Sequence, residues 1–236
     1  LPLMMVLWLL MLRGLGIEMQ HHVNHEMWRT FWDRAFALGS MLLAIFFGAA
    51  LGNVVRGVPL NADGYFFEPL WTSFTVQAEA GILDWFTVLM GLVALFTLTV
   101  HGANYLAMKT EGNVQARSRT FAGVAWLGVL LTSIATLIAA SSIRPEIWNN
   151  YSEHSWGYMF PLLGVVGLVG MIYHSKTKQD ARAFLSSATF IAGMLASTAF
   201  GLFPNVLPAS TDAKYNLTIY NTAAQGYGLQ VGIVWW

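Results

Sequence analysis

The sequence predicts an all-α fold, a polytopic transmembrane helical bundle with five full and two partial spans. Its 236 residues are 56% hydrophobic and only 10% charged, whereas an ordinary soluble domain is about 25% charged. The apolar residues gather in runs of about 20, the length that an α-helix needs to cross a bilayer. Gly and Ala are interspersed in these runs, which is typical of packed membrane helices rather than of β-barrel strands. A soluble single-core protein is therefore excluded.

The full spans are separated by short polar segments. They are expected at about residues 35–55, 82–108, 121–141, 156–173 and 183–203. A partial span precedes them and ends at Leu12, and another begins near Leu229. We expect residues 1–236 to form a single integral membrane domain. We also expect a fragment of a longer protein, because the chain opens at Leu1 without an initiator Met and stops at Trp236 within a new apolar run.

The distribution of Lys and Arg predicts the orientation of the spans. Three alternate connecting segments hold nine of the 12 positive residues, and each segment between them holds one. Short loops rich in Lys and Arg stay in the cytoplasm. The expected cytoplasmic segments are 13–34, 109–120 and 174–182. The expected outward segments are 56–81, 142–155 and 204–228.

Charge and cysteine content exclude several function classes. Twelve Lys and Arg balance 12 Asp and Glu, so the chain has no basic surface of the kind that nucleic acid requires. It contains no cysteine, which excludes disulfides, thiolate metal sites, iron–sulfur clusters and a cysteine nucleophile. The sequence also lacks a Gly-rich phosphate loop, a nucleophile elbow and an HExxH zinc motif.

A His-rich segment after the first partial span is a candidate metal site. If the segment is helical, Glu18, His21, His22 and His25 fall on one helical face. A carboxylate with three imidazoles can bind a metal ion. The alternative is a solvated segment beside the membrane with no shell around the histidines.

An aromatic segment follows the histidines. Trp32 and Asp33 lie in it, and Arg29 and Arg34 flank the carboxylate. One interpretation is an interfacial anchor with a local ion pair, since Trp gathers at membrane interfaces. The other is a functional carboxylate.

Small and polar residues end the first full span. Gly48 and Gly52 form a four-residue-spaced contact strip for a neighbouring helix. Asn53 can hydrogen-bond across helices, and Gly57 with Pro59 is expected to terminate the span.

Arg56 lies on the expected outward side, where Arg is scarce. A lone Arg there runs against the charge rule. We therefore expect Arg56 to pair with a carboxylate or with backbone carbonyls, within this chain or across a subunit boundary. Glu79 and Asp84, near the same interface, are expected to be solvated.

His101 is the one histidine inside a predicted span. An ionisable group within the membrane is by default a functional hypothesis. One interpretation is a haem ligand, and the other is an imidazole that donates one hydrogen bond across helices. Haem ligation by two histidines needs a second, facing imidazole at similar depth, and no other predicted span contains one.

Several runs together resemble subunit II of the cytochrome bd quinol oxidases. The longest are GAALGNVVRGVPLN at 48–61 and HGANYLAMKTEG at 101–112. The others are residues 13–18, 28–33, 39–40, 203–210 and 217–221. Their order and spacing extend the resemblance over nearly the whole chain.

The resemblance implies a haem-free membrane subunit built of two four-helix bundles and a peripheral helix. This chain would lack the first two helices and the last one. The complex oxidises quinol and reduces dioxygen to water, and its haems b and d belong to the partner, subunit I. In some members subunit II binds a quinone, or a small accessory subunit joins the heterodimer. The expected location is the cytoplasmic (inner) membrane of a bacterium or archaeon.

The resemblance assigns this chain no catalytic residue, no haem ligand and no metal site. It implies a structural or interface role for 14 motif residues. These are Arg13, Glu18, Trp32, Asp33, Asn53, Arg56, Gly57, Pro59, His101, Gly102, Asn104, Tyr105, Pro204 and Pro208. The alternative function is a standalone secondary transporter, which would show inverted repeats and helices broken near the midplane. The sequence contains no internal repeat.

Overall fold

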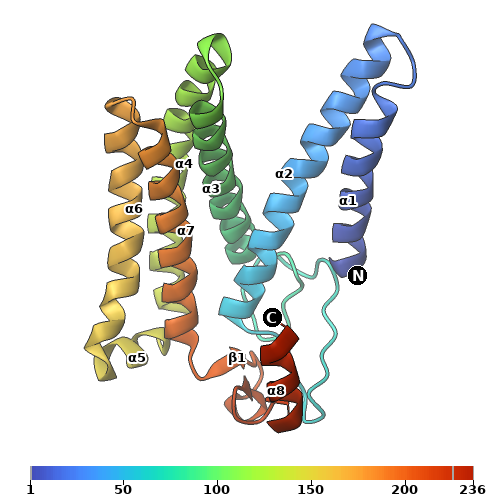
Figure 1. Ribbon diagram of the computed structural model, residues 1–236. Coiled ribbons are helices and arrows are strands. Elements are labelled where there is room, and N and C mark those ends of the chain that lie inside the picture. The colour runs from blue at the N-terminus through green and yellow to red at the C-terminus, as the bar shows by residue number, and fades with distance from the viewer. Residues whose placement is uncertain (1, 225, 236) are drawn as a thin grey trace.

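The computed structural model describes residues 2–224 and 226–235, and most of them are helical (Figure 1). The long helices are α1 (Pro2–Met19), α2 (Glu26–Arg56), α3 (Trp85–Lys109), α4 (Gly112–Ile143), α6 (Met159–Lys176) and α7 (Asp180–Leu202). The shorter elements are α5 (Ile147–Glu153), α8 (Gly226–Trp235), the 3₁₀ helices η1 (Ser155–Tyr158) and η2 (Ala213–Tyr215), and the strands β1 (Asn205–Leu207) and β2 (Leu217–Thr218). Leu1 and Trp236, the end residues of the predicted partial spans, lie outside the described residues.

Five helices are long and apolar enough to cross a membrane. They cover Glu26–Arg56, Trp85–Lys109, Gly112–Ile143, Ser155–Lys176 and Asp180–Leu202. Each contains or closely matches one predicted full span. The described parts of the two partial spans are also helical, in α1 and α8. The predicted fold class is therefore confirmed.

The predicted cytoplasmic segments are shorter than expected. Within these three segments, only residues 20–25, 110–111 and 177–179 are not helical. The helices continue past their apolar stretches because polar side chains leave the backbone hydrogen bonds of a helix intact. His174, expected at a span end, consequently lies in the last turn of α6.

Four helices, α3, α4, α6 and α7, form a bundle. Contacts join α3 to α4, α4 to α6, α6 to α7 and α7 back to α3. Each helix contributes to one buried cluster, with Val100 from α3, Val129 from α4, Met171 from α6 and Phe190 from α7. This arrangement is one four-helix bundle of the kind that the resemblance implies.

The pair α1 and α2 lies beside this bundle. Figure 1 shows α2 against α3 near the end of α2, with the two helices diverging toward the opposite end. Glycines allow the close approach, because a Cβ atom at Gly48 would lie 2.5 Å from the backbone oxygen of Met90. A Cβ atom at Gly52 would lie 3.0 Å from the Cα atom of Thr87. The predicted contact strip is therefore confirmed.

Substituting Gly48 tests this packing. We expect Gly48→Ala to destabilise the protein by about 1–3 kcal/mol, because the new methyl group meets backbone that must move away. The matched control is Gly102→Ala, since a Cβ atom there would meet nothing within 4 Å. The measurement is the apparent melting temperature of the detergent-purified protein. Equal melting temperatures for the two variants would contradict the close helix contact.

Segments far apart in the sequence meet where α2 ends. We call this the Arg56 end; it comprises the last turn of α2, the first turn of α3, residues 57–84 and residues 203–222. Val58 and Ala209 pair as an isolated parallel bridge. Together with Leu60 they form a buried cluster. The antiparallel strands β1 and β2 lie beside it.

Candidate functional site

The guanidinium group of Arg56 is buried at the end of α2 and has five hydrogen-bond partners. Its Nε atom donates to the Gly57 oxygen over 3.3 Å. Its Nη1 atom donates to the carboxylate of Asp84 and, over 3.0 Å, to the Gly81 carbonyl oxygen. Its Nη2 atom donates to Asn53 Oδ1 over 2.6 Å and to Glu68 Oε1 over 2.8 Å. The expected partner of Arg56 is therefore present, and the chain itself supplies it. We call Asn53, Arg56, Glu68 and Asp84 the Arg56 network.

Asp84 is completely buried, so the expectation that it is solvated was wrong. Its Oδ1 atom accepts hydrogen bonds of 2.8 Å from the backbone nitrogens of Phe86 and Thr87, and Thr87 completes a capping box at the start of α3. The free N–H groups and positive dipole of a helix N-terminus favour a carboxylate. Together with Arg56 they offset the cost of burying the charge. Glu79 is exposed, as expected.

Asn53 connects α2 to the residues that lead into α3. Its Nδ2 atom donates to the Ala49 oxygen over 2.8 Å and to the Ile82 oxygen over 2.9 Å. Its Oδ1 atom accepts from Arg56. The side chain therefore uses both its donor and its acceptor groups away from water.

A second arginine, Arg144, lies just after α4 and contacts the end of α2. Its Nη2 atom donates over 2.6 Å to the backbone oxygen of Arg56, where a cation also complements the helix dipole. Gly57 caps the helix with φ of 95°, and a Cβ atom there would lie 2.6 Å from that nitrogen. Glycine is therefore required, and the predicted termination at Gly57 is confirmed. Val58 continues the chain by donating to the Pro208 oxygen over 3.1 Å.

Two carboxylates share Arg56, and this affects the protonation of Glu68. Burial raises the pKa of Glu68 above its ordinary value, Arg56 opposes the increase, and the nearby negative charge of Asp84 adds to it. The net direction is upward because burial is the largest of these contributions. The side chains of Arg56 and Glu68 are only 3% and 5% exposed, so solvent compensates little.

A raised pKa in the folded state predicts a pH dependence. The folded protein binds the Glu68 proton more tightly than the unfolded chain, so this contribution to stability is complete below the ordinary glutamate pKa. It is lost as the pH rises through the raised value. We expect the melting temperature of the Glu68→Gln variant to fall less over this pH range than that of the unsubstituted protein. Parallel pH profiles would contradict the raised pKa.

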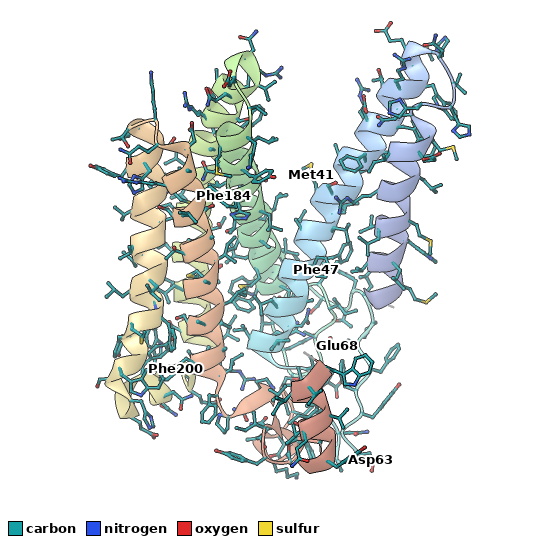
Figure 2. All side chains as sticks on the ribbon, in the orientation of Figure 1. Met41, Phe47, Asp63, Glu68, Phe184 and Phe200 are labelled. Carbon is teal, nitrogen blue, oxygen red and sulfur yellow. The ribbon has the colours of Figure 1, made fainter. Side chains whose placement is uncertain are left out.

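His101 joins α3 to α7. Its Nδ1 atom lies 2.8 Å from Ser187 Oγ. The Ser187 hydroxyl donates to the Phe184 oxygen over 2.6 Å, so its single proton is used and Nδ1 of His101 acts as the donor. The imidazole also stacks on the Phe184 ring, 4.7 Å between centroids, and Figure 2 labels Phe184. These contacts match the interpretation of His101 as a helix-joining hydrogen-bond donor.

The neighbours of His101 in the sequence differ in their contacts. Asn104 is buried, and its Nδ2 atom donates to the Ala183 oxygen over 3.4 Å. Tyr105 is about half exposed and packs against Phe184, with 5.6 Å between ring centroids. Gly102 is exposed and has no packing neighbour that a side chain would meet.

The motif residues of α1 and α2 form a separate group. Arg13 lies over the Phe36 ring at 5.3 Å. Trp32 packs edge-on against Trp28 and Phe31. In the described part of the chain, Arg13 Nε and Trp32 Nε1 are buried without a hydrogen-bond partner.

Two of the arrangements considered for this region are not found in the structure. Helix α1 ends at Met19, so His21 and His22 lie in a turn and His25 caps α2. The histidines therefore do not extend along one helical face with Glu18, and residues 2–224 and 226–235 contain no cluster suited to a metal ion. Asp33 is exposed and, among these residues, makes no ion pair.

The comparisons with known proteins decide the family. The family model described as cytochrome bd terminal oxidase subunit II matches residues 1–236. The chain belongs to this family. The match covers the Arg56 network, the His101 contacts and the α1–α2 pair alike.

Named relatives agree with this family. The chain is 30% identical to the probable cytochrome oxidase subunit 2 of Haemophilus influenzae, over 98% of the chain and 67% of the relative. It is 28% identical to cytochrome bd-I ubiquinol oxidase subunit 2 of Escherichia coli, over 97% and 66%. For the cytochrome bd ubiquinol oxidase subunit 2 of Bacillus subtilis the values are 24%, 98% and 64%. The chain thus spans about two thirds of the length of these relatives.

A solved structure shares the fold. A chain of the bd oxidase from Geobacillus thermodenitrificans superposes with a TM-score of 0.69 at 18% identity, over 99% of this chain and 67% of that chain. None of these comparisons supports a secondary transporter.

The two prolines of the run FPNVLPAS, residues 203–210, lie at the Arg56 end. The Pro204 oxygen accepts a hydrogen bond of 3.0 Å from the backbone nitrogen of Ile219, beside the β1–β2 pair. Pro208 is fully buried. Pro59 lies two residues after Gly57, which caps α2.

Sequence reasoning did not predict three residues that contact Arg56 or His101: Arg144, Glu68 and Ser187. Arg144 shows the same exception to the charge rule as Arg56, so it could have been found. Glu68 is the single charge in a run of aromatic and apolar residues, FFEPL, which also signals burial. Ser187 carries no signal, since serines are frequent in these helices and only the packing places this one opposite His101.

Proposed function

We propose that the chain is the haem-free subunit II of a cytochrome bd-type quinol:dioxygen oxidoreductase, non-catalytic by itself. Its partner is a haem-bearing subunit I. The observation that carries the proposal is the family match over all 236 residues, and the relatives named as subunits of ubiquinol oxidases support it. In the complex, quinol supplies electrons and protons, and dioxygen is reduced to water. The haems b and d, held by subunit I, supply the redox chemistry.

The residues of this chain have a supporting role in the proposal. The Arg56 network joins α2 to α3, and His101 with Ser187 joins α3 to α7. In the Arg56 network and in the His101–Ser187 pair, the hydrogen-bond donors and acceptors all belong to this chain. The motif residues then maintain a single membrane domain against which subunit I, and in some complexes a small accessory subunit, can pack.

An apolar cavity suits the tail of a bound quinone. It has a volume of about 280 Å³ and lies between α2, α7 and the β1–β2 pair. Its lining residues are Leu51, Val54, Leu195, Thr198, Ala199, Leu202, Phe203, Pro204, Asn205, Val206 and Ile219. Mostly hydrocarbon surfaces of this kind match an isoprenoid chain. A quinone held there would have a structural role in this subunit.

The membrane setting follows from the five spans. We propose the cytoplasmic (inner) membrane of a bacterium or archaeon, with the Lys- and Arg-rich turns in the cytoplasm and the Arg56 end outside. Both orientation and compartment rest on the charge pattern and on the family.

Haem content tests the proposed function. We expect the subunit expressed alone to show no Soret absorption and no quinol oxidase activity, whereas co-expression with subunit I gives both. We expect His101→Gln in the assembled enzyme to leave the haem content unchanged. Stoichiometric haem in the isolated subunit, lost on His101→Gln, would overturn the proposal.

A further inference from the structure

The segment 57–84 presents an exposed aromatic surface that the proposed function does not use. Tyr65, Phe67, Trp71 and Phe74 each expose more than half of their side-chain surface, and Phe66 exposes 38%. We call these five residues the 65–74 aromatic surface. Trp71 and Phe74 contact each other, with 5.8 Å between ring centroids. Five largely exposed aromatic residues within ten positions are unusual for a segment that faces only water, and exposed apolar groups that gather in one region mark interaction surfaces.

Hydrogen bonds fix the depth of this surface relative to the spans. The backbone nitrogens of Ile82 and Leu83 donate to the oxygens of Pro69 and Leu70 over 3.0 and 3.1 Å. The nitrogen of Trp85, the first residue of the α3 span, donates to the Phe74 oxygen over 3.2 Å.

The Arg56 network adds a second constraint. Glu68, within the same segment, is bonded to Arg56 in the last turn of the α2 span, and Figure 2 labels Glu68 near that end. Residues 68–74 are therefore tied to the last residue of one span and to the first residue of the next. They lie level with the ends of the two spans, where a bilayer that the spans cross changes from hydrocarbon to headgroups.

The chemistry of the segment fits this border. Between Gly64 and Ala78 the sequence contains no Lys or Arg, and its one acid, Glu68, is turned into the Arg56 network. The exposed groups are aromatic rings with Thr and Ser between them. Aromatic side chains with a polar edge are enriched where headgroups meet acyl chains. An uncharged surface also avoids the cost of bringing a charge toward hydrocarbon.

We propose that residues 65–74 form an interfacial anchor that inserts its aromatic side chains into the headgroup layer of the membrane. The occupant of this surface is lipid. The Arg56 network then has a second effect, since it holds the anchor at the depth at which α2 ends and α3 begins.

Spin labels measure the depth directly in the complete complex. Because this chain has no cysteine, a nitroxide can be attached at Phe67→Cys or Phe74→Cys in liposomes, with any cysteine elsewhere in the complex replaced by serine beforehand. The control is Asp63→Cys, exposed on the same segment. We expect the labels at 67 and 74 to collide more with oxygen, which dissolves in lipid, than with a water-soluble nickel chelate. We expect the reverse at 63.

Two outcomes would overturn the proposal. Preferential collision with the nickel chelate at 67 and 74 would place the surface in water. Protection from both reagents would place it under a protein partner.

A measurement without cysteine substitution provides a second test. Acyl chains brominated near the headgroup quench the fluorescence of tryptophans at that depth. Iodide, which stays in water, quenches the tryptophans that face water. We expect Trp71→Phe to reduce the part of the fluorescence that the brominated lipids quench and to leave the part that iodide quenches unchanged. A loss confined to the iodide-quenched share would overturn the lipid contact.

Discussion

Replacing Arg56 with alanine is expected to lower the yield and the melting temperature of the assembled complex more than any other single change considered. Arg56→Ala leaves Asp84 and Glu68 buried without their shared cation. Removing one member of a buried ion pair typically costs about 3–5 kcal/mol. The Asn53 Oδ1 atom and the Gly81 oxygen lose a donor in the same change. The measurements are the amount of complex in membranes and its thermal unfolding in detergent.

The matched control is Arg117→Ala. Arg117 is exposed and makes no ion pair among the described residues, so we expect wild-type yield and stability. If Arg56→Ala also assembles and melts like the unsubstituted complex, Arg56 behaves as a solvated residue. The Arg56 network would then not stabilise the protein.

Asp84→Ala has the second-largest expected effect, because Asp84 is both an ion-pair partner and a helix cap. The alanine variant loses the cap, which is worth about 1 kcal/mol, in addition to the charge. Asp84→Asn separates the two contributions, since asparagine caps helices nearly as well as aspartate. We expect the order of stability to be wild type, then Asp84→Asn, then Asp84→Ala.

Two further variants define the coupling. The double variant Arg56→Ala/Asp84→Ala should cost less than the sum of the single changes, because the second removal no longer leaves a partner unpaired. Asp63→Ala, an exposed carboxylate on the same segment, should have no effect. Additive losses would show that Arg56 and Asp84 stabilise the protein independently.

The sequence predicted the spans well because a membrane helix has one dominant requirement, a run of apolar residues. It predicted the glycine strip for a similar reason: Gly48 and Gly52 recur at the spacing that brings helices together. Helix ends were less predictable. Polar residues such as His174 or Arg119 can extend a helix into water, and nothing in local composition says where the backbone turns.

The polar sites were predictable only where one residue breaks a rule. Arg56 breaks the charge rule, and its need for a partner followed. Asp84 breaks no such rule, because an aspartate near a span end is ordinarily solvated. The one signal of its role is its position three residues before Thr87, which fits a capping box. The position of Ser187 opposite His101 depends on how α3 and α7 pack, which the sequence alone does not determine.

The bridge between Val58 and Ala209 has a consequence for the order of folding. Thr211 also reaches back to the Leu60 oxygen across 151 residues, so these contacts cannot form until α7 has been synthesised. The contacts of Arg56 with Asp84 span only 28 residues and can form while the chain is still being made. Local contacts generally precede those that close long loops. During biosynthesis the Arg56 end is therefore completed in two stages, first between α2 and α3 and then around residues 203–222.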